Sequence, residues 1–351
     1  MRKFSLVCVS SILTCVCVPS LAQVGPPSGC DGVTGNCSIV DQTSSDNDAL
    51  VGQSGSENEA YVEQSSKGGG ETAEGTQDGI GNILTISQIG SVGGNVATSR
   101  QFGNDGEATI TQGGASNGAI ADILQGALAE KNVATIEQLG TTGNEALIGQ
   151  DNGIANSALI RQSDDENRAE IIQSGSDNEA NTTQSGTAFF AGHAEAFVTQ
   201  TGNDNISTVE QSTDGGQFIE VVQTGDFNVS TVFQGRSGIS SGNEVNLIQI
   251  GNGNTSLIDQ GFNSDNNLAD VLQEGNGNSS TISQNSFLGA ALANRIDLDQ
   301  VGDASISTIT QGGGQDNFAR VGQYGYAQVS SVSQTGNGNI ASVMQGVMPT
   351  P

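Results

Sequence analysis

The residues of this chain that could do chemistry are mostly carboxylates and carboxamides. The sequence holds 38 Asp and Glu against 10 Lys and Arg, with a single His, His193. Hydrolysis of a glycosidic bond needs two carboxyl groups at a defined separation, whereas the carboxylates here are scattered and few basic residues accompany them. The sequence therefore disfavours an enzyme and no catalytic residue is assigned. His193 is interpreted as a solvated residue of the loop from Ser185 to His193.

Metal, cofactor and nucleic-acid sites are also disfavoured. With a single His, the sequence offers few ligands for a zinc site. A calcium-binding coil needs a recurring Gly-Gly-x-Gly-x-Asp motif, and its nearest approach, Gly312-Gly313-Gly314-Gln315-Asp316, does not recur. No Gly-rich loop opens a helix before a Lys, as a phosphate site requires. A net charge of −28 repels nucleic acid, so we expect no cofactor and no nucleic-acid partner.

Glutamine is the side chain with the most regular spacing. It closes 26 copies of a heptad that is typified by Asn156-Ser157-Ala158-Leu159-Ile160-Arg161-Gln162. Counting back from each Gln, the second residue is Val, Ile or Leu in 23 copies, the fourth is Ala or Ser in 22, and the sixth is Asn in 19. Of these 104 positions only one, Glu71, carries a charge. A period of two with one dry face predicts a half-buried strand.

The spacing between glutamines predicts how the strands are connected. From Gln53 to Gln64 and at every second gap thereafter, ten of twelve spacings are 11 residues, whereas the intervening gaps run from 11 to 16. A short edge alternating with a variable edge indicates two strands per turn. We therefore predict an all-β fold, a β-solenoid of about 13 two-strand rungs. Stacked β-arches would form parallel, in-register sheets on two sides, about 60 Å long at a strand spacing of roughly 4.8 Å.

The inward amides are expected to form ladders. A buried amide without a partner costs a few kcal/mol, but on identical residues each amide can donate to one rung and accept from the other. The end rungs would then have open hydrogen-bonding groups unless another chain docks, which is a route to polymerisation. The predicted ladder consists of Asn58, Gln64, Asn82, Gln88, Asn132, Gln138, Asn156, Gln162, Asn167, Gln173, Asn205, Gln211, Asn228, Gln234, Asn254, Gln260, Asn278, Gln284, Asn339 and Gln345.

The short connections carry Gly two residues after Gln and Asn five residues after it, as in Gln53-Ser54-Gly55-Ser56-Glu57-Asn58. Gly adopts positive φ most readily and Asn next best, so both positions are expected to turn the chain.

Four segments are predicted along the chain. Residues 1–22 have the basic start, apolar run and small-residue cleavage site of a secretory signal peptide. Residues 23–35 form a flexible leader, residues 36–345 the solenoid, and residues 346–351 a tail with two prolines. Loss of Arg2 and Lys3 with the signal would take the net charge from −28 to −30. In an oxidising compartment Cys30 and Cys37 either form a small disulfide or remain two free thiols.

The unit Gln-x-Gly-x-x-Asn-x-Ala-x-(Val/Ile)-x-Gln resembles the curlin repeat, the building block of bacterial curli fibres. It stands almost unaltered from Gln53 to Gln64, and with Ser for Ala from Gln249 to Gln260. The resemblance implies a protein exported through the periplasm that self-assembles outside the cell, or at its surface, into amyloid fibres of the biofilm matrix, which contribute to adhesion and aggregation. It also implies two partners, a minor or nucleator subunit and an outer-membrane secretion pore that recognises a leader around Gln23 to Ser45.

Three other interpretations remain open at this point. The composition, with 50 Gly and no Trp, also suits a disordered prion-like tract, although phase-locked repeats argue against it. A surface adhesin or binding solenoid that never polymerises would have the same repeat, and so would a fibre nucleator. The acidic surface predicts that assembly accelerates with salt or acid, unless the carboxylates serve only to keep the chain soluble.

Overall fold

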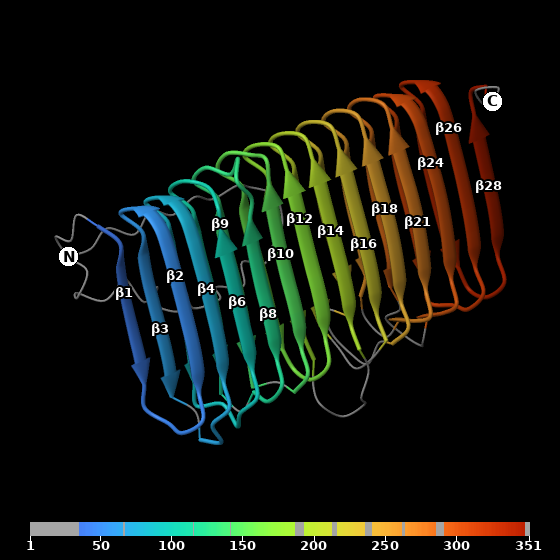
Figure 1. Ribbon diagram of the computed structural model, residues 1–351. Helices are drawn as coiled ribbons and strands as arrows, with labels where there is room; N and C mark the ends of the chain where they lie inside the picture. The colour runs from blue at the N-terminus through green and yellow to red at the C-terminus, as the bar shows by residue number, and fades with distance from the viewer. Residues whose placement is uncertain are drawn as a thin grey trace, which may run out of the picture.

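The computed structural model describes residues 35–347 except 66, 115, 141, 187–192, 213–215, 236–240, 262–263 and 286–290. Within this part of the chain all regular structure is β-strand. The strands stack side by side from the N-terminal to the C-terminal end along one axis (Figure 1). The predicted signal peptide, the leader up to residue 34 and the end of the C-terminal tail lie outside the described residues.

Twenty-six strands form two 13-stranded parallel sheets. Sheet A contains β1 (Cys37–Gln42), β3 (Glu59–Ser65), β5 (Ile83–Ile89), β7 (Glu107–Gly113), β9 (Val133–Leu139), β11 (Ser157–Ser163), β13 (Glu179–Ser185), β15 (Ile206–Ser212), β17 (Val229–Gln234), β19 (Thr255–Gln260), β22 (Ser279–Asn285), β25 (Ile306–Gly312) and β27 (Val329–Thr335). Sheet B contains β2 (Asp48–Ser56), β4 (Thr72–Ile80), β6 (Val96–Gln101), β8 (Ile120–Gln125), β10 (Glu145–Asp151), β12 (Arg168–Ser174), β14 (Glu195–Thr201), β16 (Phe218–Thr224), β18 (Glu244–Ile250), β21 (Leu268–Glu274), β24 (Arg295–Asp303), β26 (Phe318–Tyr326) and β28 (Ile340–Gln345).

One strand of each sheet makes a rung, so β1 with β2 is the first rung and β27 with β28 the last. The predicted solenoid of 13 two-strand rungs is confirmed. Register places equivalent residues on one another: Ala158 pairs with Ala180 and Gln162 with Gln184. A shift of one residue would turn every inward side chain to solvent, so the heptad itself sets this register.

The core is a thin layer between the two sheets. It consists of columns of Ile, Val, Leu and Ala, such as Ile136, Ile148, Ile160 and Ile171, all fully buried. Each buried Val, Leu or Ile side chain contributes roughly 1.5–3 kcal/mol. Because the columns run through all rungs, stability is shared between neighbours instead of residing in one centre.

The two edges of the solenoid differ. The tight edge carries the chain from sheet B of one rung to sheet A of the next, and the loose edge carries it from sheet A to sheet B within a rung. At the tight edge, glycines two residues after Gln adopt positive φ, 112° at Gly225 and 109° at Gly251. The expectation that Asn shares this role is wrong: in the first turn the left-handed residue is Glu57, with φ 61°, and Asn58 is fully buried instead. Its preference at that position reflects hydrogen bonding, described below.

Small additional pairings occur at the loose edge. The two-residue strands β20 (Ser264–Asp265) and β23 (Ala291–Leu292) pair in parallel, and single bridges join Gly93 to Asn117 and Asn117 to Thr142. The described residues include no helix with the length and apolarity to span a membrane.

Candidate functional site: the amide ladders and the open end rungs

Two continuous ladders of glutamine run the length of the solenoid. In sheet A, each Nε2 donates to the Oε1 of the next rung, from Gln42 to Gln64 at 2.6 Å through to Gln311 and Gln334 at 2.8 Å. Sheet B repeats this pattern from Gln53 to Gln345, with distances between 2.8 and 3.0 Å. All the bonds point the same way, with the donor on the N-terminal side.

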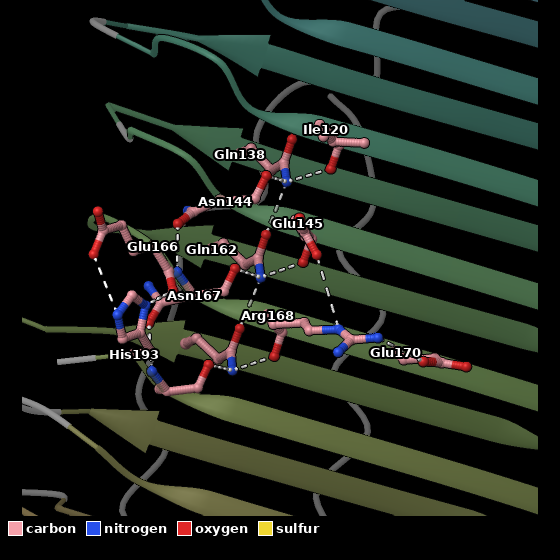
Figure 2. Close-up of polar contacts among 12 residues, drawn as sticks. Ile120, Gln138, Asn144, Glu145, Gln162, Glu166, Asn167, Arg168, Glu170 and His193 are labelled. Atoms are coloured by element: carbon pink, nitrogen blue, oxygen red, sulfur yellow. Dashed lines mark hydrogen bonds and ion pairs between the residues drawn. The ribbon is translucent and has the colours of Figure 1, made fainter.

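The second amide hydrogen of each glutamine sets this direction. Gln162 Nε2 also contacts the main-chain oxygens of Glu145 at 3.0 Å and Asn167 at 3.1 Å (Figure 2). A backbone carbonyl can only accept a hydrogen bond, so the amide nitrogen of Gln162 must lie on the side of these two carbonyls. Its amide oxygen then faces Gln138 in the preceding rung and accepts from it. Because Gln162 ends a strand of sheet A and Glu145 begins one of sheet B, each glutamine also ties the two sheets together.

The asparagines bond differently from the glutamines. At the tight edge, the backbone N–H of each Asn donates to the Oδ1 of the preceding one, as Asn228 does to Asn205 at 3.0 Å and Asn254 to Asn228 at 3.0 Å. The Nδ2 of Asn205 donates to the carbonyl of Gly225 at 2.7 Å, and that of Asn228 to Gly251 at 2.8 Å. The asparagines therefore satisfy turn backbone that would otherwise be buried without partners.

The structure places the twenty predicted ladder residues in four groups. Eight asparagines, residues 58, 82, 132, 156, 205, 228, 254 and 278, lie at the tight edge, and Asn167 and Asn339 lie at the loose edge. Eight glutamines, residues 64, 88, 138, 162, 211, 234, 260 and 284, end strands of sheet A, whereas Gln173 and Gln345 end strands of sheet B. All twenty are buried except Asn339 and Gln345 in the last rung.

An outer ladder at the tight edge was missed by the sequence analysis. Here the backbone N–H of Asn203 donates to Asp226 Oδ1 at 2.8 Å, and that of Asp226 to Asn252 Oδ1 at 2.8 Å. The ladder continues with the N–H of Asn252, which donates to Asn276 Oδ1 at 3.0 Å, and with that of Asn276, which donates to Asp303 Oδ1 at 2.7 Å. The signal that could have found it is the recurring Asn or Asp three residues after Gln.

The buried asparagine ladder has interruptions. Gly106 takes the Asn position at the tight edge and offers no side chain to the next rung. Asn132, which follows it, is fully buried, and its Nδ2 has no partner among the described residues. At the loose edge, Glu71 stands in the place of Asn and is also fully buried. Burial raises the pKa of Glu71 above the usual carboxyl range, against smaller opposing effects of hydrogen bonds from Ser91 and Asn95.

The predicted disulfide is only partly within view. Cys37, at the start of β1, is disulfide-bonded. Cys30 lies outside the described residues, so its pairing with Cys37 stays a prediction.

His193 is largely exposed and contacts Glu166 through both ring nitrogens (Figure 2). Its Nδ1 lies 3.1 Å from the carbonyl oxygen of Glu166, and its Nε2 lies 3.5 Å from Oε2 of the same residue. Among the described residues no group of three or more His, Cys, Asp or Glu side chains could hold a metal ion.

Outward carboxylates of sheet B are spaced along the solenoid. The register stacks Glu170, Phe197 and Glu220 on successive strands of sheet B. The two carboxylates of this column are therefore separated by a rung with a neutral side chain. Where two acids do stack, at Asp270 and Asp297, an arginine accompanies each: Arg295 lies 3.2 Å from Asp270, and Arg320 lies 3.6 Å from Asp297. Such exposed pairs contribute about 0–1 kcal/mol each, but the spacing limits repulsion within the chain.

The two end rungs present complementary unpaired groups. At the first rung, no described residue donates to the Oε1 of Gln42 or Gln53. At the last rung, the Nε2 groups of Gln334 and Gln345 donate to backbone carbonyls, at 3.0 Å to Phe318 O and at 2.7 Å to Val329 O, but to no further glutamine. Inward side chains that are buried elsewhere are uncovered here: Val40 is 46% exposed, against 0% for Val62 in the next rung. Chemically, this arrangement can extend a ladder in one orientation.

Replacing Gln200 with Leu is expected to destabilise the middle of the solenoid by about 3 kcal/mol. Gln200 accepts from Gln173 at 2.8 Å and donates to Gln223 at 2.8 Å. The substitution would therefore leave Gln173 without its ladder acceptor and Gln223 without its ladder donor, both in the buried core. Denaturant unfolding followed by circular dichroism measures the loss. Thr199→Ala, on the outward face of the same strand, serves as the control and should cost about 0.5 kcal/mol or less. Equal losses would contradict the ladder as a source of stability.

Comparison with known protein families gives four matches to the curlin associated repeat, over residues 39–65, 153–186, 264–289 and 314–346. The second of these segments spans β11, β12 and β13 with their connections, and so contains the ladder residues of both sheets. No curated protein sequence matches the chain.

Proposed function

Because this chain is a curlin-repeat protein, we propose that it is a structural subunit, not an enzyme, which self-assembles end to end into extracellular fibres. One observation carries the proposal: two glutamine ladders run in a single direction, and each stops at both ends of the solenoid. Gln42 and Gln53 accept from no glutamine at the first rung, and Gln334 and Gln345 donate to no glutamine at the last. A second copy of the chain supplies the matching groups, and the last rung of one copy would continue as the first rung of the next.

The polarity of the ladders selects one docking orientation. With β27 against β1 and β28 against β2 of the next copy, Gln334 and Gln345 donate to Gln42 and Gln53, and all inward columns continue. Two first rungs would bring amide oxygens face to face, and two last rungs would bring N–H groups face to face, which leaves both sets unsatisfied. The resulting fibre is polar, and each copy adds about 60 Å at roughly 4.8 Å per rung.

Electron microscopy of the chain without residues 1–22, incubated after purification, tests the proposal. Unbranched fibres that bind thioflavin are the expected result. Particles that stay dispersed at every concentration would overturn it and favour the surface adhesin that never polymerises.

The remaining cellular roles are proposed on the family resemblance. Residues 1–22 would direct export to the periplasm, and the segment from Gln23 to Ser45 would be recognised by an outer-membrane secretion pore. A minor subunit would nucleate the fibre, or this chain would itself be that nucleator. Fibres at the cell surface would contribute to adhesion and aggregation in a biofilm matrix. Deleting residues 23–34 while keeping the signal peptide should retain the chain in the periplasm, which cell fractionation measures.

Elongation should accelerate with ionic strength. Copies without residues 1–22, whose net charge is −30 after loss of Arg2 and Lys3 from the −28 of the full chain, repel each other as they approach. The Debye length falls from about 30 Å at 0.01 M salt to about 10 Å at 0.1 M. Seeded elongation followed by thioflavin fluorescence should therefore be faster at the higher salt concentration. A rate that does not change would show that the spaced carboxylates and arginine pairs already neutralise the approach.

A further inference from the structure

Among the described residues, Glu71 is the only Asp, Glu, Lys or Arg that is buried. It precedes β4 in the second rung, at the loose-edge position held by Asn47 in the first rung and Asn95 in the third. Its backbone N–H donates to Asn47 Oδ1 at 3.2 Å, just as asparagine N–H groups do elsewhere in the solenoid. The chain therefore places a carboxyl group inside a ladder that is otherwise built from carboxamides.

The contacts of Glu71 reproduce those of the amide one rung away. Asn95 accepts from the N–H of Ala119 at 2.9 Å through Oδ1, and donates through Nδ2 to Ser116 Oγ at 2.7 Å. Glu71 accepts from the N–H of Asn95 at 3.2 Å through Oε2, and its Oε1 is hydrogen-bonded to Ser91 Oγ. The Ser91 hydroxyl can donate to a carboxylate Oε1 or rotate to accept from a protonated one. A carboxylic acid with its proton on Oε1 therefore matches both roles of the amide, because it accepts through Oε2 and donates through Oε1.

No described charge compensates an ionised Glu71. Asp48 and Glu74 lie on the outward face of β2 and β4 and are exposed, and so are Asp46 and Lys67 in the flanking connections. Ser91 and Asn95, which face the carboxyl group from the third rung, are neutral. Burial without a counter-ion disfavours the charged form, in agreement with the raised pKa of this group.

We propose that Glu71 is held as a neutral acid in the folded solenoid and acts as a proton-dependent latch on its first three rungs. With its proton in place, the loose edge of β2, β4 and β6 is hydrogen-bonded as in the rest of the molecule. Loss of the proton buries a carboxylate in the ladder and loosens that edge. Where it concerns assembly, the inference rests on the proposed function, because these rungs form the end on which another copy docks.

The direction of the pH effect follows from linkage. A carboxyl whose pKa is raised by folding takes up a proton in the folded state. Its stabilisation is complete below the ordinary carboxyl range and is lost as pH rises through the raised value. Within that window the opening equilibrium of the first rungs should rise about tenfold per pH unit.

Hydrogen exchange of the dispersed chain tests the latch without requiring fibres. The backbone amides of Thr72 and Asn95, corrected for intrinsic exchange, should lose protection from pH 5 to pH 8 in the natural chain, by about tenfold for each unit within the window. Glu71→Gln keeps both contacts without the ionisable group, so its protection should not change with pH. Glu74→Gln removes the same charge from the outward face of β4 and should behave as the natural chain does. Identical profiles for all three proteins would overturn the latch.

Seeded elongation tests the consequence for assembly. Glu71→Gln should elongate faster than Glu74→Gln near pH 8. The two rates should converge near pH 5, where Glu71 of the Glu74→Gln variant is neutral and the variants differ by only one outward charge. Suppose that the two variants elongate at equal rates at both pH values while hydrogen exchange behaves as expected. Glu71 would then be a latch on the first rungs that does not control assembly. If no fibres form from any variant, the proposed function fails, and the exchange profiles still decide the protonation of Glu71.

Discussion

Gly225→Ala is expected to lower the stability of the solenoid by on the order of 4 kcal/mol, a loss found only where backbone strain and steric overlap coincide. Gly225 has a φ of 112°, and a Cβ there would lie 2.1 Å from the carbonyl oxygen of Gly251 in the next rung. The obstacle is backbone, so no rotamer change relieves it. The carbonyl of Gly225 also accepts from Asn205, so a displaced turn would break the asparagine ladder. Denaturant unfolding measures the loss.

Gly253→Ala is the matched control, because it lies in the next tight turn along the chain. Gly253 has a φ of 67° and nothing within 4 Å of an added Cβ. The equivalent turn position is occupied by Ala304 and Ala327, with φ 58° and 55°, so alanine is already tolerated there. The expected cost is about 1 kcal/mol. Equal losses in the two variants would show that positive φ alone, and not the close approach of successive turns, requires glycine at Gly225.

Val343→Asp is expected to stop elongation while the dispersed chain stays folded. Val343 faces inward in the last rung and is only half-buried, whereas Val321 and Leu298 in the two preceding rungs are fully buried. Docking of a second copy would cover it with Val51 and bury the new carboxylate without a partner. That costs several kcal/mol, and each 1.4 kcal/mol is tenfold in affinity, so elongation should fall at least about a hundredfold.

Ser342→Asp provides the control for this experiment. It adds the same charge to the same strand, but on the outward, exposed face, and should change elongation only through repulsion between copies, an effect that salt screens. Thioflavin kinetics from preformed seeds compare the two variants, and circular dichroism confirms that both stay folded. Equal elongation by Val343→Asp and Ser342→Asp would mean that copies do not join through their end rungs.

Much of the fold could be predicted from the sequence, because one heptad encodes both the strand and its buried face. The uncharged inward positions and the alternating gaps between glutamines predict strand pairing, register and two strands per rung, as seen where Gln162 pairs with Gln184. The prediction is strong because the same constraint is repeated 26 times, so a local ambiguity in one copy is resolved by its neighbours.

Other features depend on geometry that the spacing does not contain. Asn58 was expected to turn the chain because Asn tolerates positive φ. Instead, Glu57 adopts that conformation. Asn58 bonds to the next turn of the stack, where its Nδ2 donates to Gly79 O and its Oδ1 accepts from the N–H of Asn82. Ladder direction requires knowing which backbone carbonyls face each amide. The role of Glu71 could not be predicted because it depends on Ser91. This loose-edge residue lies outside the heptads, and only the structure shows that it contacts Glu71.

Electron cryomicroscopy of fibres grown from the purified chain tests the central claim most directly. We expect strands perpendicular to the fibre axis at a spacing of about 4.8 Å, a subunit repeat near 60 Å, and density for both glutamine ladders that continues from Gln334 and Gln345 of one copy into Gln42 and Gln53 of the next. Fibres in which neighbouring copies alternate in direction, or in which the ladders break at every subunit boundary, would contradict it.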